Sequence, residues 1–383
     1  MKKLIFPLWV ISAITLFLYS FTQVDLSLTL SQISIWQTLQ NFFQQIGWFN
    51  RPLSAILFVS VVLLLFVLYG FTLKVVRKGT LGRSDLWKII IVVSVILFFA
   101  YNAFSYDLFN YIFDAKILVH YNQNPYEHKA LDYPNDPMLS FMRWTHRTYP
   151  YGPVWLFITV PIYFIGFGYF LLTFYLFKLL MALSFIGSVF FIEKIARKTI
   201  ANPNLAVAAF ALNPLVLVES LVSAHNDIVM IFLALVAVYT FIEGRYIKSF
   251  LFLLASILLK YATVLIIPGL FIKKILNSNN SFFYTLIVSM SVAVLFATYR
   301  TNFQPWYLLF VLPFTAFVYE KYFISIPVFI ISFFALLQYL PFIYLGNWNP
   351  PVPSILNWMM VGSAIVSVVL MAWWKFSKRE GQN

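Results

Sequence analysis

The acidic residues and histidines of this chain are concentrated in one polar stretch, residues 106–152. Of the 13 Asp and Glu residues and 4 His residues in the sequence, eight lie in this stretch: Asp107, Asp114, Glu127, Asp132, Asp136, His120, His128 and His146. Carboxylates and imidazoles are common general acids and bases. The chemistry of the protein is therefore expected in this stretch.

Asp107 and Asp114 are the candidates for catalysis. Asp107 directly follows an apolar run, and a carboxylate at a membrane boundary is costly unless it is hydrated or paired, which favours a functional role. The alternative is a helix cap, for which Asp is well suited. Asp114 lies two helical turns later and returns to the same face. With Asn110 and Tyr111, it would present a polar face to a cavity.

The rest of the stretch offers rigid turns and cations. Asn-Pro-Tyr at 124–126 and Tyr-Pro-Tyr-Gly-Pro at 149–153 are typical turn sequences. Arg143 and Arg147 suit an anionic headgroup, because a guanidinium binds phosphate bidentately. The alternative for both is an ordinary anchor at a membrane interface. The candidates for substrate binding here are Asn124, Tyr126, Arg143, His146, Arg147 and Tyr149.

Polar residues also interrupt later apolar segments. Residues 225–227 are three consecutive hydrogen-bonding side chains at the end of an apolar run, and such groups are hard to place against lipid. Lys260 lies within another apolar run and needs an anion or a cavity. A lipid phosphate would serve, and so would Glu219 or Glu243. Further candidates for substrate binding are His225, Asn226, Asp227, Lys260, Gln304, Trp306 and Tyr307.

The sequence has no glycine-rich phosphate loop and no Cys or His pair at zinc spacing. Asp132 and Asp136 are four residues apart among prolines, which favours a solvated loop over a cation site. We therefore expect no cofactor and no metal site, although a divalent cation stays open.

Composition indicates an all-α, polytopic transmembrane protein. The chain is 62% apolar and only 10% charged, and apolar runs of about 20 residues, long enough to cross a bilayer, recur throughout. The runs do not alternate as strands of a membrane barrel would. The net charge of +13 is not interpreted as nucleic-acid binding, because Lys and Arg mark cytoplasmic loops in such proteins.

We expect about 12 membrane spans within a single integral-membrane domain, 1–383, whose first span is an uncleaved N-terminal segment. Residues 23–50 carry apolar side chains at three- and four-residue spacing, which fits either an interfacial amphipathic helix or a solvated loop. The expected spans are 4–22, 53–73, 87–105, 153–168, 170–192, 204–222, 228–243, 248–271, 281–299, 306–319, 322–341 and 355–374.

The basic residues predict the orientation. Those between the second and third spans, with those near both ends of the chain, place the termini in the cytoplasm and residues 106–152 outside. Beyond that point two arrangements remain. Straight counting places Lys194 to Lys198 outside. If 150–168 enters without crossing and 248–271 is a hairpin that breaks near Lys260, they lie inside with the other cations, which is the arrangement we prefer.

Taken together, the polar motifs resemble those of the integral-membrane GT-C glycosyltransferases that use polyprenyl-phosphate sugars. The likeness is greatest to bacterial polyprenol-phosphate-mannose-dependent α-1,6-mannosyltransferases, and it extends more distantly to the catalytic subunit of GPI mannosyltransferase I. It covers about residues 100 to 310. The motifs that carry it, in order, are residues 107–114 (DLFNYIFD), 124–126 (NPY), 149–153 (YPYGP), 213–215 (NPL), 224–227 (AHND), Lys260 and 304–307 (QPWY).

The resemblance implies an extracytoplasmic active site in which Asp107 is the catalytic carboxylate and Asp114 the second acid. Two departures concern the donor sugar and the acceptor. Relatives often have Trp-Asp-Gly where this chain has Phe113-Asp114-Ala115, and Tyr-Pro-Pro where it has Tyr149-Pro150-Tyr151.

The predicted function is transfer of a hexose, mannose by resemblance, from a polyprenyl-phosphate sugar to an extracytoplasmic glycan or lipid. The predicted site lies on the outer face of the cytoplasmic membrane, and the reaction inverts the sugar, with a loop Asp as base. A glycosyl phosphate has a good leaving group, so one carboxylate for the acceptor hydroxyl and one cationic site for the phosphate suffice. The alternatives are a transporter or flippase of lipid-linked sugars, and a structural subunit of a cell-envelope complex.

Overall fold

The computed structural model describes residues 2–380, and its regular elements are helices. Six of the described helical segments are long and apolar enough to cross a membrane, or seven if one bent pair counts as a span. The six are Leu4–Gln23, Arg51–Arg77, Phe170–Thr199, Asn279–Thr301, Tyr322–Leu345 and Val352–Ser377. The protein is thus a polytopic helical membrane protein, as predicted.

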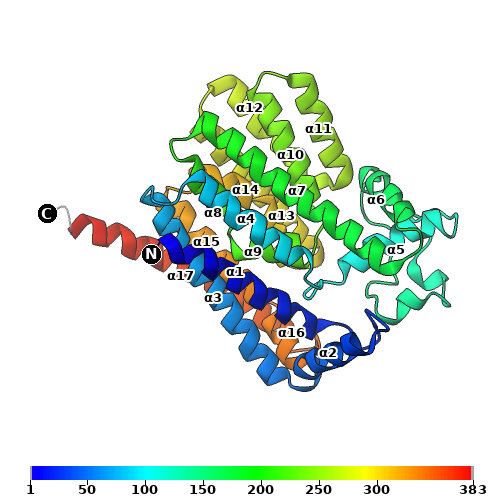
Figure 1. Cartoon of the computed structure of the whole chain (residues 1–383). Coiled ribbons are helices and arrows are strands. Elements are labelled where there is room, and N and C mark those ends of the chain that lie inside the picture. The colour runs from blue at the N-terminus through cyan, green and yellow to red at the C-terminus, as the bar shows by residue number, and fades with distance from the viewer. Residues whose placement is uncertain (1, 381–383) are drawn as a thin grey trace.

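Figure 1 shows the helices as one bundle with a smaller group at one end. In chain order they are α1 (Lys2–Ser20), α2 (Ser34–Gln44), α3 (Arg51–Arg77), α4 (Arg83–Phe98), α5 (Asp107–Val119), α6 (Pro153–Ile165), α7 (Phe170–Thr199), α8 (Pro203–Ala211), α9 (Pro214–Leu217), α10 (Asp227–Ile242), α11 (Tyr246–Leu259), α12 (Ile267–Leu276), α13 (Asn279–Thr301), α14 (Leu312–Thr315), α15 (Tyr322–Leu337), α16 (Leu340–Leu345) and α17 (Val352–Glu380). Short turns used below are η5 (Val218–Val222), η6 (Tyr261–Ile266) and η7 (Pro305–Phe310).

The structure does not support the expected count of about 12 spans. The predicted span 306–319 is broken into η7 and the four-residue α14, because Pro313, within this run, removes a backbone donor. The predicted span 248–271 breaks after Leu259. Helices α6 and α10 are shorter than a usual span, with 13 and 16 residues, and α4 already ends at Phe98.

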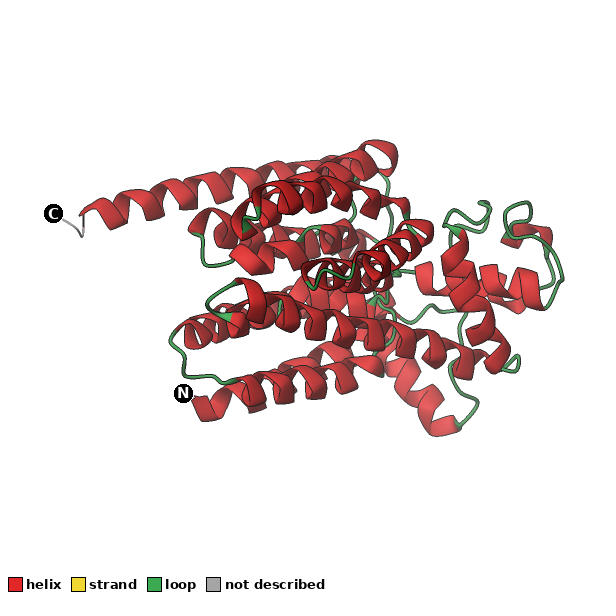
Figure 2. Cartoon of the chain, turned by 90° about the horizontal axis from the view of Figure 1, so that it is seen from above, coloured by secondary structure: helices red, strands yellow, loops and turns green. Residues whose placement is uncertain are grey.

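The two ends of the bundle differ in composition. The marked N and C ends lie toward one end of the bundle, whereas α5 and α6 lie at the opposite end (Figures 1 and 2). Ion pairs between Arg83 and Glu193 and between Lys198 and Glu243 bring the cations of α4 and α7 to the same end. This geometry agrees with the preferred arrangement, in which these cations share one side.

The hairpin predicted within 248–271 is confirmed. Helix α11 ends at Leu259, Lys260 is extended, and η6 with α12 continues in a new direction. At the far end of α12, Lys273 donates to Asn279 over 2.7 Å, and Asn279 donates to the Thr199 carbonyl over 3.2 Å. Both ends of the hairpin therefore lie at the basic end of the bundle. Its break at Lys260 lies at the opposite end, where α5 is.

The segment between the first two long helices contains a helix, α2, which has the predicted amphipathic pattern. Trp36, Leu39 and Phe42 remain exposed on it, whereas Gln44 is buried and donates to the Val24 and Asp25 carbonyls. A short helix with an exposed apolar face at the end of the bundle fits an interfacial position.

The centre of the bundle is the bent pair α8 and α9 with η5 and the start of α10. Every residue from 205 to 231 is buried. The pair bends by 56° at Asn213-Pro214, where the Asn213 side chain accepts from Leu215 N and donates to Ser332. Broken helices are tolerated at membrane depth only where protein surrounds them. The polar residues that follow this break are thereby held in the protein interior.

The polar stretch packs against the break at Lys260. Gly152 N donates to the Leu259 carbonyl over 3.1 Å, and a Cβ at Gly152 would lie 1.9 Å from the Leu258 carbonyl oxygen. Tyr149 N donates to the Pro125 carbonyl, which ties the two predicted turns together. Only glycine permits this close approach, so the stretch is anchored to the helix that precedes Lys260.

Candidate active site

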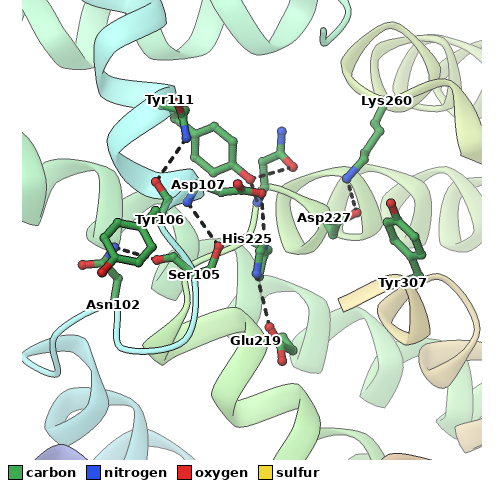
Figure 3. A network of polar contacts seen from close by, with 12 residues as sticks. Asn102, Ser105, Tyr106, Asp107, Tyr111, Glu219, His225, Asp227, Lys260 and Tyr307 are labelled. Atoms are coloured by element: carbon green, nitrogen blue, oxygen red, sulfur yellow. Dashed lines mark hydrogen bonds and ion pairs between the residues drawn. The ribbon is translucent and has the colours of Figure 1, made fainter. Parts of the chain in front are cut away.

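Asp107 is the first residue of α5, and its carboxylate faces His225 (Figure 3). Its Oδ2 lies 3.6 Å from His225 Nδ1, and its side chain is 12% exposed. Tyr106, not Asp107, occupies the cap position of α5. The capping alternative is therefore wrong, and the carboxylate is directed into the site.

His225 lies between two carboxylates. Its Nε2 is 3.3 Å from Glu219 Oε2, and both side chains are fully buried. Glu219 is held in turn by Tyr339, whose hydroxyl donates to Oε1 over 2.8 Å. The Trp306 ring stacks on the imidazole with centroids 4.1 Å apart. These contacts fix both the position and the plane of the imidazole.

The pKa values of Asp107 and His225 depend on each other. Burial lowers the pKa of His225, but the neighbouring carboxylates of Asp107 and Glu219 raise it to about 9. Burial raises the pKa of Asp107, but His225, Arg147 and Lys260 outweigh this effect and hold it below its usual value. Each group therefore favours the charged form of the other.

Lys260 supplies a second cation. Its Nζ donates to Asp227 Oδ1 over 2.6 Å, and the side chain is 23% exposed. It also lies 5.9 Å and 5.7 Å from the ring centroids of Tyr151 and Phe310. Neither of the two acids considered as alternative partners of Lys260 contacts it. Glu219 contacts His225, and Glu243 pairs with Lys198 at the other end of the bundle. The second oxygen of Asp227 is buried without a hydrogen bond.

Asn226 and Tyr111 connect α10 to α5. The Tyr111 hydroxyl donates to Asn226 Oδ1 over 3.3 Å and accepts from Asn226 N over 3.4 Å. Ala224, just before this turn, has a φ of 57°, a left-handed conformation that is uncommon for residues other than Gly and Asn. The sharp turn aims three consecutive side chains at α5 and Lys260.

Arg147 is the cation that the polar stretch contributes. Its guanidinium lies 5.8 Å from the Tyr151 ring centroid. Burial lowers the pKa of Arg147, but Tyr151 and Asp107 raise it above its usual value. The Tyr151 ring packs edge-on to Tyr111, with centroids 5.5 Å apart. The guanidinium of Arg147 is therefore close enough to Asp107 for each to shift the pKa of the other, as a phosphate-binding role requires.

Asp114 lies on α5 without a partner for its buried Oδ2. Burial raises its pKa to about 7, with Arg147 opposing and Asp107 adding to the increase. The effect of Asp107 on the pKa of Asp114 supports the prediction that the two side chains lie on the same face of α5. The pKa values of the two acids therefore shift in opposite directions, because burial dominates at Asp114 and the neighbouring cations dominate at Asp107.

The remaining candidates lie around this centre. Asn110 donates to the Tyr106 carbonyl, and the Tyr307 hydroxyl bonds to Thr301 over 2.6 Å beside the Trp306 ring. Gln304 is half-buried at the start of η7, where its carbonyl accepts from Tyr307 N.

Other candidates in the polar stretch are used within it. Asn124 donates to Glu127, Tyr126 donates to the Tyr151 carbonyl, and Tyr149 donates to the Gly152 carbonyl. Arg143 pairs with Asp25 over 3.0 Å, and His146 is exposed near Trp144. The structure does not bring these five side chains to Asp107.

The prediction of a solvated loop is wrong for Asp136. Its side chain is buried, pairs with Lys116 and accepts from Tyr121 over 2.7 Å. It also caps the short turn at Pro137 by accepting from Met138 N. Asp132 is half-exposed and bonds to Lys129 N. Within residues 2–380 no group of three His, Asp or Glu side chains is arranged to hold a metal ion.

Sequence reasoning missed the roles of Glu219, Tyr339 and Tyr151. Glu219 was noticeable as an acid within an apolar run, and pairing it with the only histidine of the same run would have found the contact. Tyr339 is one of 23 Tyr residues, and no local pattern distinguishes it.

A carboxylate beside His225, with the charge of Lys260 acting on it, lies at one end of a bundle of membrane spans. These features define a multi-pass membrane protein with a site suited to proton transfer and anion binding. A family model described as "Alpha-(1->6)-mannopyranosyltransferase, N-terminal domain", of the MptA_B family, matches residues 10–274, more than half of the chain. The chain therefore belongs to this family and is a glycosyltransferase that acts on mannose. The match includes Asp107, His225 and Lys260 but not Trp306. No curated protein and no solved structure gives a significant match.

Proposed function

We propose that this protein transfers mannose from a polyprenyl-phosphate-mannose donor to a hydroxyl group of an extracytoplasmic glycan or lipid, with inversion at the sugar. We further propose that the fold is of the GT-C type and that the protein lies in the cytoplasmic membrane with its site on the outer face. The observation that carries this proposal is the carboxylate of Asp107 held 3.6 Å from His225, with a pKa that His225, Arg147 and Lys260 hold below its usual value.

In this proposal Asp107 is the base. It accepts the proton of the acceptor hydroxyl while that oxygen forms a bond to the anomeric carbon. The bond from that carbon to the phosphate oxygen breaks on the opposite face, and polyprenyl phosphate leaves with the electron pair. A single in-line displacement of this kind inverts the anomeric centre.

Lys260 and Arg147 receive the phosphate, and the fully buried His225 supports it through its charge without direct contact. In the resting site these cations lower the basicity of Asp107. As the leaving phosphate gains charge, they interact more strongly with it and less with Asp107, so Asp107 becomes a better base as the reaction proceeds. Cations placed where charge develops are the main means of lowering such a barrier.

A lipid-linked donor is supported by an apolar groove that follows Lys260. The groove has a volume of about 500 Å3, lies between η6, α12 and α13, and is lined by Leu265, Pro268, Tyr284, Val288 and Val292 among others. A polyprenyl chain there would place its phosphate toward Lys260. A donor linked to a soluble nucleotide has no use for such a groove.

The outer location of the site is supported by charge. Arg83, Arg197 and Lys198 gather at the end opposite Asp107, and the end of a membrane protein rich in Lys and Arg faces the cytoplasm. Family membership also favours a transferase over the transporter and the structural subunit considered as alternatives.

The test is a transfer assay with purified protein in liposomes. Synthetic polyprenyl-phosphate mannose, polyprenyl-phosphate glucose and a nucleotide-linked mannose are offered separately, each with a mannoside acceptor. We expect a product from polyprenyl-phosphate mannose alone. NMR should show that its anomeric configuration is the opposite of that of the donor. Transfer from the nucleotide-linked sugar, or retention of configuration, would refute the proposal.

A further inference from the structure

A second groove opens at the basic end of the bundle, away from Asp107. It has a volume of about 620 Å3 and lies between the last turns of α3, the first half of α15 and α17. Figure 1 shows these helices together on the side from which α17 projects. Most of its wall is apolar, with Leu73, Phe329, Ile330 and Leu370 among the lining residues. Such a wall suits a hydrocarbon chain.

Three cations line the same groove. Lys74 lies one helical turn before Arg77 and Lys78 at the end of α3, and all three are exposed. The Arg77 guanidinium lies 5.8 Å from the Tyr319 ring centroid and donates to the Tyr319 carbonyl over 3.4 Å. One cation is thereby held in place at the mouth of the groove, and the two lysines flank it.

Within the part of the chain that the structure describes, these cations have no anionic partner. The ion pairs of the part of the chain that the structure describes use Arg83, Lys198 and other cations, but not Lys74, Arg77 or Lys78. Of the neighbouring acids, Glu193 pairs with Arg83 and Arg197, and Glu320, which follows Tyr319, is exposed and forms no ion pair with these cations among the described residues. Three adjacent positive charges beside an apolar groove therefore lack a counter-ion.

We propose that this groove binds an anionic phospholipid of the bilayer, with its phosphate at Lys74, Arg77 and Lys78 and an acyl chain along the apolar wall. Basic pockets between transmembrane helices on the cytoplasmic side bind anionic headgroups in this way. The site is separate from the proposed donor groove, which lies between α12 and α13, and it does not depend on the proposed function.

The lipid would also fill a gap in the packing of α17. Only 11% of the apolar window of this helix is buried, and its neighbour along the bundle is α15, where Tyr322 stacks on Trp374 with centroids 4.1 Å apart. An acyl chain between α17 and α3 would cover Leu370 from the other side. The bound lipid therefore holds the last helix against the bundle.

The experiment is a native mass-spectrometry titration of the full-length protein with phosphatidylglycerol and with phosphatidylcholine of the same acyl chains. We expect phosphatidylglycerol to bind more tightly. The variant Lys74→Gln/Arg77→Gln/Lys78→Gln should weaken phosphatidylglycerol binding by about tenfold or more, because each cation near an anionic headgroup contributes measurably. The three side chains are exposed, so folding should not be affected.

Two further variants make the result specific. Lys248→Gln/Lys273→Gln/Lys274→Gln removes the same charge from the same end, outside the groove, and should bind phosphatidylglycerol normally. Ser325→Trp fills the groove while it keeps all three cations, and should weaken binding as well. Equal losses in the two triple variants, normal binding by Ser325→Trp, or equal affinity for soluble glycerol phosphate would each overturn the proposal.

Discussion

His225 Nε2 lies 3.3 Å from Glu219 Oε2, on the side of the imidazole turned away from Asp107. Glu219 belongs to the buried turn η5, and Tyr339 donates to its other oxygen. A buried carboxylate behind the imidazole favours the charged form of His225. Glu219 is thus placed to control the charge of the group that faces Asp107.

We expect Glu219→Gln to shift the pH profile of kcat/KM. His225 has a pKa raised to about 9, so wild-type activity should fall as the pH rises through this value. Loss of the Glu219 charge lowers the pKa of His225, and the alkaline limb should move to lower pH. Tyr339→Phe is the matched control, because it keeps the Glu219 charge and should not move the limb downward. An unshifted limb in Glu219→Gln would show that Glu219 has a packing role only.

Asp107→Asn should fold and bind donor but lose turnover by roughly 10²-fold or more, the usual scale of general-base catalysis. The amide keeps the size of the side chain but cannot accept the proton. Single-turnover kinetics with saturating donor measure the effect. Asp114→Asn should reduce turnover less. If Asp107→Asn stays active while Asp114→Asn or Asp227→Asn is inactive, the base lies elsewhere.

Lys260→Ala should weaken donor binding, by about 10- to 100-fold in KM if one hydrogen bond to a charged phosphate is lost. It also leaves the buried Asp227 carboxylate without its partner, which destabilises a protein. The double variant Lys260→Ala/Asp227→Asn separates the two effects. It should recover the melting temperature but not the donor KM. Recovery of both would contradict a role for Lys260 in donor binding.

The stability of the wild type should decrease between about pH 4 and pH 7 because of Asp114. The pKa of Asp114 is raised to about 7 in the folded state from about 3.9 in an unfolded chain. The folded state therefore prefers its neutral form, and this stability is fully present below the unfolded pKa and lost as the pH rises through 7. Melting temperatures of Asp114→Asn should show a smaller decrease over this range. Parallel curves for the two proteins would show that Asp114 is hydrated.

The polar stretch should be accessible from outside the cell. Leu131 is 50% exposed in this stretch, and Leu131→Cys introduces a thiol into a cysteine-free chain. It should react with an impermeant maleimide on intact cells or spheroplasts. Lys248→Cys, at the basic end, should react only after lysis. The reverse pattern would refute both the orientation and the proposed donor.

The sequence alone was sufficient to identify site residues whose type is rare in an apolar chain, and helices whose apolar pattern is long. Asp107, His225 and Lys260 were candidates because polar groups in an apolar sequence require a reason, whereas the break near Lys260 was predicted from the distribution of Lys and Arg. The number of spans was not predictable from apolarity, because α10 and the bent pair α8 and α9 are apolar through burial in protein. The pairing of Lys260 with Asp227 depends on the approach of α10 and α11, which no local pattern specifies.

Glu219, His225 and Asp107 contact one another in that order. Asp107 is the one of the three that reaches the surface, because its side chain is 12% exposed and the other two are fully buried. In the proposed reaction, a proton that Asp107 gains has no route to water past the buried His225, and it would leave by the exposed face of Asp107, from which the acceptor hydroxyl also approaches. Release of the proton and release of the glycosylated product would then use the same face, so a product that stays bound would also keep the base protonated and prevent a second transfer.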